Sequence, residues 1–140
     1  MNKVNGPIVV KIGGSTLGTH DTTLQDLAGL QKEGYPIVTV HGGGKVISQW
    51  MERQGVLPHF VRGNRVTDSQ SLDIVIAVLT GLINKQLVAS LLSLKAKVIG
   101  ISGVDGGILE CKLSETSELG LVGEVTSVDP LALETLMAKG

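Results

Sequence analysis

The feature that most constrains the fold is residues 38–47, V-T-V-H-G-G-G-K-V-I, where a β-branched run meets three consecutive glycines. A second apolar run, Ile8–Ile12, also ends at glycines, Gly13 and Gly14. Runs of this kind are typical of parallel strands that are buried on both faces. Because a glycine inside a regular element costs roughly 0.5–1 kcal/mol relative to alanine, we expect the triple glycine to have a purpose at the turn.

The segment between these two runs predicts a helix. Within residues 21–32, apolar side chains occur at positions 24, 27, 28 and 30, and Gly34 follows as a stop signal. A second helix is expected from Gly43 or Gly44 to about residue 54. The resulting βαβα pattern implies right-handed crossovers and a parallel sheet. The predicted fold class is α/β, a three-layer αβα sandwich with a mainly parallel sheet and a small surface hairpin.

The remainder of the chain continues this alternation. It first predicts a hairpin within residues 59–67, with Gly63-Asn64 as its two-residue turn, and then a long helix from Asp68 or Ser69 to about Leu94. A third buried strand is expected over 97–101. A surface hairpin from 108–113 and 121–128 follows, and a last helix runs from Asp129-Pro130 to Lys139-Gly140. With 140 residues, the chain has the size of one domain.

The long helix is apolar on more than one side. A helix of this kind must be covered on two sides, so we expect its outer face, within residues 69–94, to form a homodimer. Charged and amide residues interrupt the apolar run over 72–94, which argues against a membrane span.

Composition narrows the class of protein. A net charge of −1 argues against a nucleic-acid partner, which usually meets a basic face. The single cysteine, Cys111, excludes an internal disulfide and suits a reducing compartment. The first residues, M-N-K-V-N-G-P, lack the apolar core of a signal peptide, so a cytoplasmic location is expected.

The glycine corners predict an anion site. Glycines between a parallel strand and the next helix lie at the sheet edge where ligands of such folds bind, and the helix N-terminus favours negative charge. Lys11 lies inside an apolar strand, and a buried lysine needs a negative partner. We therefore expect Gly42, Gly43 and Gly44 to line an oxyanion or phosphate site that Lys11 faces; the alternative is a tight turn with close strand–helix packing.

Other candidate sites are weaker. Neither the P-loop pattern G-x-x-x-x-G-K-[ST] nor the dinucleotide fingerprint G-x-G-x-x-G fits these corners. Arg62, Arg65 and Lys45, taken singly, are typical of solvated surface cations. His41 and Cys111 have no partners at ligand spacing, so no protein metal site is predicted.

Several motifs together resemble the amino acid kinase family, and within it the members that phosphorylate N-acetyl-L-glutamate. They are K-I-G-G at 11–14, V-H-G-G-G at 40–44, G-N-R-V-T-D at 63–68, G-L-I-N-K at 81–85, and later G-I-S-G-V-D-G-G and L-G-L-V-G-E-V. The resemblance covers essentially the whole chain and is more specific than any one motif.

The resemblance implies ATP-dependent transfer of the γ-phosphoryl group to the side-chain carboxylate of N-acetyl-L-glutamate, with ATP and Mg²⁺ required. It implies that Lys11 is catalytic and binds the transferring phosphoryl group, and that Gly13 and Gly14 bind ATP phosphates. Gly43 and Gly44 would hold the acetylglutamate. Arg65 would clamp its α-carboxylate.

Members of this family are nearly twice as long as this chain. Residues 1–140 are therefore expected to be a single domain, the amino-acid-binding N-terminal lobe, without the ATP-binding lobe and without activity alone. Two other functions stay open: a non-catalytic dimeric carboxylate-binding module, and a related kinase that acts on carrier-bound aminoadipate.

Overall fold

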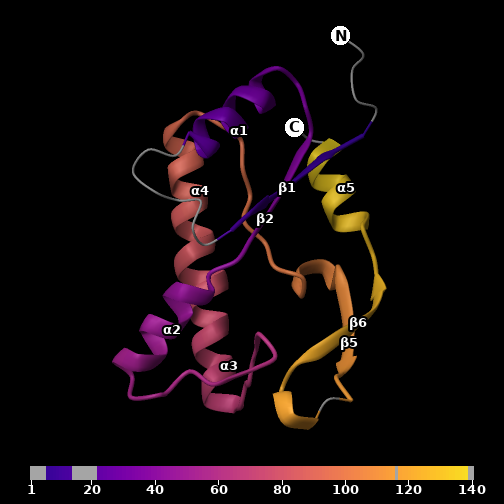
Figure 1. Cartoon of the computed structure of the whole chain (residues 1–140). Coiled ribbons are helices and arrows are strands. Elements are labelled where there is room, and N and C mark those ends of the chain that lie inside the picture. The colour runs from indigo at the N-terminus through magenta and orange to yellow at the C-terminus, as the bar shows by residue number, and fades with distance from the viewer. Residues whose placement is uncertain (1–5, 14–21, 116, 139–140) are drawn as a thin grey trace.

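A computed structural model describes residues 6–13, 22–115 and 117–138. Strands β1 (Ile8–Ile12) and β2 (Ile37–His41) are parallel, with register from Ile8↔Ile37 to Ile12↔His41, and helix α1 (Thr23–Lys32) connects them (Figure 1). Helix α2 (Gly44–Arg53) follows β2. The predicted βαβα order is confirmed, although the start expected for the first helix, at residue 21, lies outside the described residues.

One face of the β1–β2 pair is buried and the other is exposed. Ile12, on the buried face, forms a core with Leu27 and Ala28 of α1. On the opposite face, Val9 and Val40 are 66% and 50% exposed. The expectation that these strands are buried on both faces is therefore wrong, because the helices of this core pack on one face only.

The long helix is continuous but changes its pitch in the middle. It consists of α3 (Ser69–Ile76), a π-helical segment η1 (Ala77–Ile83) and α4 (Asn84–Ser93). Asp68 caps its N-terminus, where the side chain accepts a hydrogen bond of 2.8 Å from the Ser71 backbone N–H. The predicted cap and the predicted end near Leu94 are confirmed, whereas the π-helical segment was not predicted.

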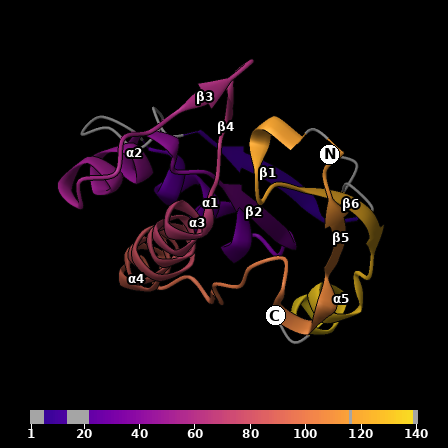
Figure 2. The same ribbon diagram turned by 90° about the horizontal axis from the view of Figure 1, so that it is seen from below.

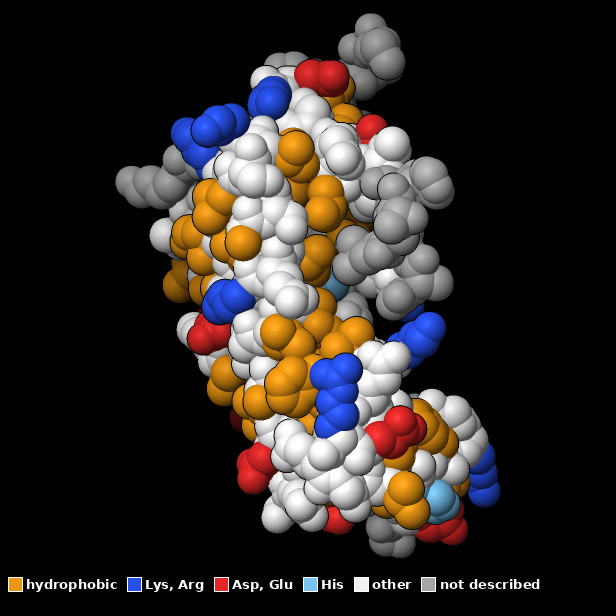
Figure 3. Space-filling model, turned by 90° about the vertical axis from the view of Figure 1, so that its left-hand side faces the viewer, with side chains coloured by type: hydrophobic (Ala, Val, Ile, Leu, Met, Phe, Trp, Pro, Cys, Tyr) orange, Lys and Arg blue, Asp and Glu red, His pale blue; other side chains and the backbone are white. Residues whose placement is uncertain are grey.

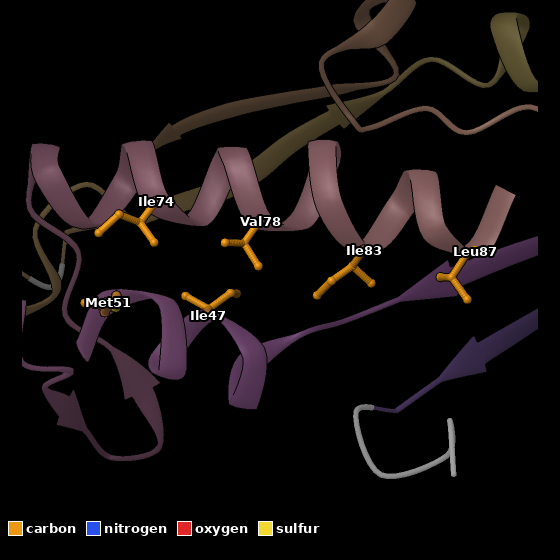
Figure 4. Close-up of a cluster of buried hydrophobic side chains, with 6 residues drawn as sticks. All are labelled: Ile47, Met51, Ile74, Val78, Ile83 and Leu87. Atoms are coloured by element: carbon orange, nitrogen blue, oxygen red, sulfur yellow. The ribbon is translucent and has the colours of Figure 1, made fainter. Parts of the chain in front are cut away.

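The main core lies between this helix and α2. Ile74, Val78, Ile83 and Leu87 point from the same side of the long helix, and they form one buried cluster with Ile47 and Met51 of α2 (Figure 4). All six residues are buried.

The helix of residues 69–93 is also long and apolar enough to span a membrane, with a mean hydropathy of 1.8. Core helices of soluble proteins pass the same test, and this one supplies much of the core in contact with α2 and α1.

The first hairpin turns one residue earlier than predicted. Strands β3 (Phe60–Val61) and β4 (Asn64–Arg65) pair Val61 with Asn64, so the turn consists of Arg62-Gly63 and not of Gly63-Asn64. Both turn residues have positive φ, 50° and 83°. A type I′ turn requires positive φ at both central residues, and its twist matches that of the two strands.

The predicted third strand over residues 97–101 is wrong. The parallel sheet of the described residues has two strands, β1 and β2. Side chains occupy the backbone groups that a neighbouring strand would otherwise pair: the Gln31 amide bonds both N–H and C=O of Lys97, and Lys85 donates to the Gly100 carbonyl.

The C-terminal part forms a separate layer. Single turns η2 (Asp105–Gly107) and η3 (Ser117–Leu119) accompany the antiparallel hairpin of β5 (Leu109–Leu113) and β6 (Gly123–Val128), and α5 (Leu131–Ala138) follows. Seen from below, this hairpin and α5 lie on the side of the molecule opposite to α2 and the long helix (Figure 2). The predicted surface hairpin and last helix are confirmed, but the expected stop at residues 139–140 lies outside the described residues.

Candidate functional site

The two glycine corners lie at one edge of the sheet. Ile12 and His41 form the last pair of the parallel register, and the Gly42 N–H donates to the Ile12 carbonyl at 3.3 Å. The carboxyl ends of both strands therefore meet, as the sequence predicted. This edge is where ligands of open α/β sheets bind.

Lys11 lies one residue before that edge. It pairs with Val40, and its side chain is exposed. Because side chains alternate along a strand, Lys11 shares the open face of the sheet with Val9, whereas Ile12 faces the helices. The structure thus places Lys11 one residue before the end of β1, on the face of the sheet away from the core.

Gly43 is packed closely against the long helix. It is buried, and a Cβ at this position would overlap the Ile83 Cδ1 atom and lie 3.0 Å from the Leu79 Cδ2 atom. Both neighbours belong to the π-helical segment. Close strand–helix packing, the alternative considered from the sequence, therefore accounts for this glycine.

Gly42 and Gly44 are different, because both are exposed and a Cβ would meet open space at either position. Packing does not explain them, so an exposed anion site remains consistent with their presence. Gly13 follows β1 and is half-buried, whereas Gly14 lies outside the described residues.

Arg65 connects the β3–β4 hairpin to the start of α2. Its Nη2 group donates to the Gly44 carbonyl at 3.0 Å and to the Ser48 hydroxyl at 2.9 Å, and Nη1 donates to the Met51 sulfur at 3.0 Å. The structure therefore places Arg65 in contact with Gly44. The family resemblance assigned both residues to the same ligand.

An aromatic ring completes the surroundings of Arg65. Its Cζ atom lies 4.6 Å from the centroid of Phe60, the residue opposite to it in the hairpin register. Burial lowers the pKa of the Arg65 guanidinium, but an arginine stays protonated at neutral pH. Arg62 and Lys45, by contrast, are exposed, as the sequence indicated.

Sequence reasoning missed the residues that hold Arg65. Ser48 lies one helical turn after Gly44, and its hydroxyl donates to the Gly44 carbonyl at 3.1 Å. Two features of the sequence could have indicated them: Ser48 follows Gly44 by four residues within α2, and Phe60 lies opposite Arg65 in the hairpin.

A second polar network lies on the core side of the same corner. The Asn84 Nδ2 group lies 3.2 Å from His41 Nε2 and 3.5 Å from the Ile101 carbonyl, while Lys85 Nζ donates to Asn84 Oδ1 at 3.0 Å. Asn84 is 8% exposed. The sequence pointed to it as an amide that interrupts an apolar helix and as part of the G-L-I-N-K motif, but gave it no role in a site.

A carboxylate lies near this network. Hydrogen bonds from the backbone N–H and the hydroxyl of Ser102 lower the pKa of Asp105, and the charge of Lys85 lowers it further. Among residues 6–13, 22–115 and 117–138, no group of three or more His, Cys, Asp or Glu side chains could hold a metal ion.

Comparison with known proteins shows the family to which this chain belongs. The model of the amino acid kinase family matches residues 6–140. Acetylglutamate kinase of Dehalococcoides mccartyi strain 195 is 43% identical over 135 residues, which are 96% of this chain and 49% of that protein. Acetylglutamate kinase of Prochlorococcus marinus strain NATL1A is 43% identical over 97% of this chain and 46% of its own length. The chain thus spans about half the length of the curated relatives it matches.

Solved structures agree on the fold. The crystal structure of smu.665 from Streptococcus mutans UA159 superposes with a TM-score of 0.86 at 26% identity, over 95% of this chain and 55% of that one. N-acetylglutamate synthase from Neisseria gonorrhoeae, solved with coenzyme A and N-acetyl-glutamate, superposes with a TM-score of 0.69 at 24% identity, over 95% of this chain and 31% of that one. By family model, relatives and fold, the chain belongs to the amino acid kinase family.

Proposed function

We propose that this chain is the amino-acid-binding part of an acetylglutamate kinase of arginine biosynthesis, which phosphorylates the side-chain carboxylate of N-acetyl-L-glutamate with ATP. The curated relatives at 38–43% identity carry the name acetylglutamate kinase, which supports this substrate. The observation that carries the proposal is the Arg65 guanidinium, which is fixed beside the first residue of α2.

The geometry around Arg65 suits a carboxylate. The contacts to Gly44, Ser48 and Met51 use three of the five N–H donors of the guanidinium, and two donors have no hydrogen-bond partner among the described residues. The remaining donors, on Nε and Nη1, point to different sides of the guanidinium, so each can contact an anion singly. In the proposal, the α-carboxylate of acetylglutamate accepts from one of them, while the exposed start of α2 faces the rest of the ligand.

The reaction needs charge neutralisation more than it needs a base. The acceptor carboxylate is already ionised at neutral pH, so the main task is to align two anionic reactants and to stabilise the transferring phosphoryl group. In this proposal, Lys11 binds that group at the sheet edge. Gly13 and Gly14 offer backbone donors to ATP phosphates, and Mg²⁺ arrives with the nucleotide.

The proposed catalytic unit is larger than this chain. Because the curated relatives are about twice as long, we assign the adenine site and the remaining phosphate ligands to a second lobe. The 140-residue chain is then expected to bind acetylglutamate but not to phosphorylate it. The proposed location is the cytoplasm, whose conditions are reducing.

The long helix supports a homodimer as part of the same proposal. Hydrophobic side chains are exposed on the side of the molecule that carries this helix and α2 (Figure 3). Ile76 and Leu92 are 50% and 51% exposed. A second copy covering this side would remove that apolar surface from water. Sedimentation showing only monomer at micromolar concentration would contradict the dimer.

Calorimetric titration tests the substrate. The chain is expected to bind N-acetyl-L-glutamate more tightly than glutamate or aminoadipate. Arg65→Ala should weaken that binding at least about tenfold, since it removes a charge-assisted contact, whereas Arg62→Ala should leave it unchanged. Unchanged binding in Arg65→Ala would contradict the assignment of Arg65 to the α-carboxylate. Phosphorylation of acetylglutamate by the purified chain with ATP would contradict the proposal that catalysis needs a second lobe.

A further inference from the structure

Asn84 is a buried amide at the junction of three segments. It begins α4, contacts His41 at the end of β2 and lies against the Gly100 and Ile101 backbone. A Cβ at Gly100 would overlap the Asn84 Oδ1 atom, so these segments approach as closely as a glycine permits. A buried amide in such a place must have its donors and acceptor paired.

The partners of Asn84 determine how its amide is oriented. The Lys85 ammonium can only donate and the Ile101 carbonyl can only accept, so Oδ1 faces Lys85 and Nδ2 faces Ile101. The Nδ2 group, 3.2 Å from His41 Nε2, must then donate to that ring nitrogen. His41 is therefore the neutral tautomer that carries its proton on Nδ1, the nitrogen that lies 3.4 Å from the Gly42 carbonyl.

The π-helical segment accounts for the presence of Asn84 at this corner. Buried positions on the long helix are separated by five residues from Val78 to Ile83, but by four from Ile83 to Leu87. An interval of five is that of a π-helix, and π-bulges are frequent at functional sites. The extra residue turns Ile83 onto the core face toward Gly43 and brings Asn84 within reach of His41.

We propose that Asn84 is a positioning residue for the substrate site, acting through His41 on the triple-glycine corner. This role deepens the proposed function and rests on it. Asn84 holds the imidazole, the imidazole precedes Gly42, and Gly43 and Gly44 lead into the helix start beside Arg65. Fixing His41 therefore fixes the direction in which Gly44 and the first turn of α2 face the ligand.

This role differs from simple support of the fold. Either kind of amide would set the proton position on His41, but only a positioning amide must also set the affinity of the corner for its ligand. Two variants of His41 separate these possibilities. His41→Gln retains an acceptor that Asn84 can reach, and His41→Leu removes it.

The experiment combines imidazole nitrogen NMR with calorimetry on the full chain. Unsubstituted protein labelled with ¹⁵N-histidine should show His41 neutral and protonated on Nδ1. Asn84→Asp replaces the donor with an acceptor, so the proton should move to Nε2 or the ring should become charged. Binding of N-acetyl-L-glutamate should weaken about tenfold in Asn84→Asp and in His41→Leu, and by less than about twofold in His41→Gln.

A double variant and a matched control complete the design. If Asn84 acts through His41, Asn84→Asp combined with His41→Leu should weaken binding no more than either change alone. Gln86→Glu makes the same amide-to-carboxylate change at an exposed position two residues further along α4, and it should alter neither the His41 signal nor binding. If Asn84→Asp does not fold, the comparison of His41→Leu with His41→Gln still tests the role.

The outcomes separate this inference from the proposed function. Equal affinity in the unsubstituted chain, His41→Leu and His41→Gln would overturn the positioning role while acetylglutamate binding stands. An unsubstituted His41 protonated on Nε2 would also overturn it. A chain with the expected tautomer that does not bind acetylglutamate would overturn the proposed function, and the positioning role with it.

Discussion

Arg65 and Gly44 are 21 positions apart in the sequence, yet the Arg65 Nη2 group donates to the Gly44 carbonyl at 3.0 Å. This contact ties the β3–β4 hairpin to the start of α2. Ser48 joins it from the next turn of the helix, because its hydroxyl accepts from the same Nη2 group and donates to the same carbonyl. The guanidinium is therefore held in place before any ligand arrives, which reduces the entropy lost on binding.

Ser48→Ala should weaken acetylglutamate binding about three- to tenfold with little loss of stability. The change removes one hydrogen bond to the guanidinium, and a bond to a charged group contributes about 1.5–3 kcal/mol in favourable settings and less where water competes. Calorimetric titration measures the affinity, and thermal unfolding measures the stability.

Ser93→Ala is the matched control for Ser48→Ala. The Ser93 hydroxyl also donates to a backbone carbonyl of the preceding helical turn, that of Ser90 at 2.7 Å, but it lies at the far end of α4. Its replacement should leave the affinity unchanged. Equal losses in the two variants would show that Ser48 does not act through Arg65.

Phe60→Leu should weaken acetylglutamate binding about two- to fivefold, and Phe60→Tyr should not. The Arg65 guanidinium lies over the ring at 4.6 Å from its centroid, and an exposed cation–π contact contributes about 0.5–1 kcal/mol. Leucine keeps apolar contact but lacks the π-electron face, whereas tyrosine keeps it. The affinities of the three proteins check this directly, and a leucine variant that binds as well as the parent would exclude a role for the ring.

Much of the fold could be predicted from short-range pattern. The glycine-terminated runs, the cap at Asp68 and the Pro130 start signal each depend on local chemistry, and each led to an element that the structure contains. The motifs then identified the family, because several of them occur in order along the chain. Local chemistry pointed to Gly44 as part of an anion site, whereas only the family resemblance gave Arg65 a role, and neither placed the two residues in contact.

The parts that failed depend on tertiary contacts. Residues 97–101 have the composition of a strand, but the side chains of Gln31 and Lys85 take up the backbone groups of Lys97 and Gly100. The purpose of Gly43 was likewise invisible, because the atoms that require it belong to a helix forty residues away. Apolar spacing alone did not reveal the π-helical segment.

Gly43→Ala should lower stability, whereas Gly44→Ala should lower only the affinity for acetylglutamate. At Gly43 a methyl group would overlap the Ile83 side chain, so the free energy of unfolding should fall by about 1–3 kcal/mol. At Gly44 a methyl group meets open space, and alanine favours a helix, so stability should not fall. Acetylglutamate binding should nevertheless weaken in Gly44→Ala, since the proposal places the ligand against this backbone. Urea denaturation and calorimetry measure the two effects.

A compensating change tests the packing explanation for Gly43. Ile83→Val removes the Cδ1 atom that a Cβ at residue 43 would overlap, so Gly43→Ala should cost less stability in the Ile83→Val background than in the parent. An unchanged cost would mean that backbone conformation, and not the Ile83 side chain, requires the glycine.

The stability contributed by Asp68 should depend on pH, with the charged form favoured. The backbone hydrogen bond from Ser71 lowers the pKa of Asp68 in the folded chain, so the unfolded chain binds a proton first as the solution is acidified. This contribution should therefore be present above the ordinary aspartate pKa of about 3.9 and be lost as the pH falls through the lower folded pKa. Asp68→Asn keeps an acceptor oxygen without the charge, so it should be less stable than the parent near pH 6 and approach it in acid. Asp73→Asn, a second carboxylate lost from the same helix, serves as the control. Urea denaturation of the three proteins across this range measures the difference, and a gap between parent and Asp68→Asn that is constant with pH would rule out the charged cap.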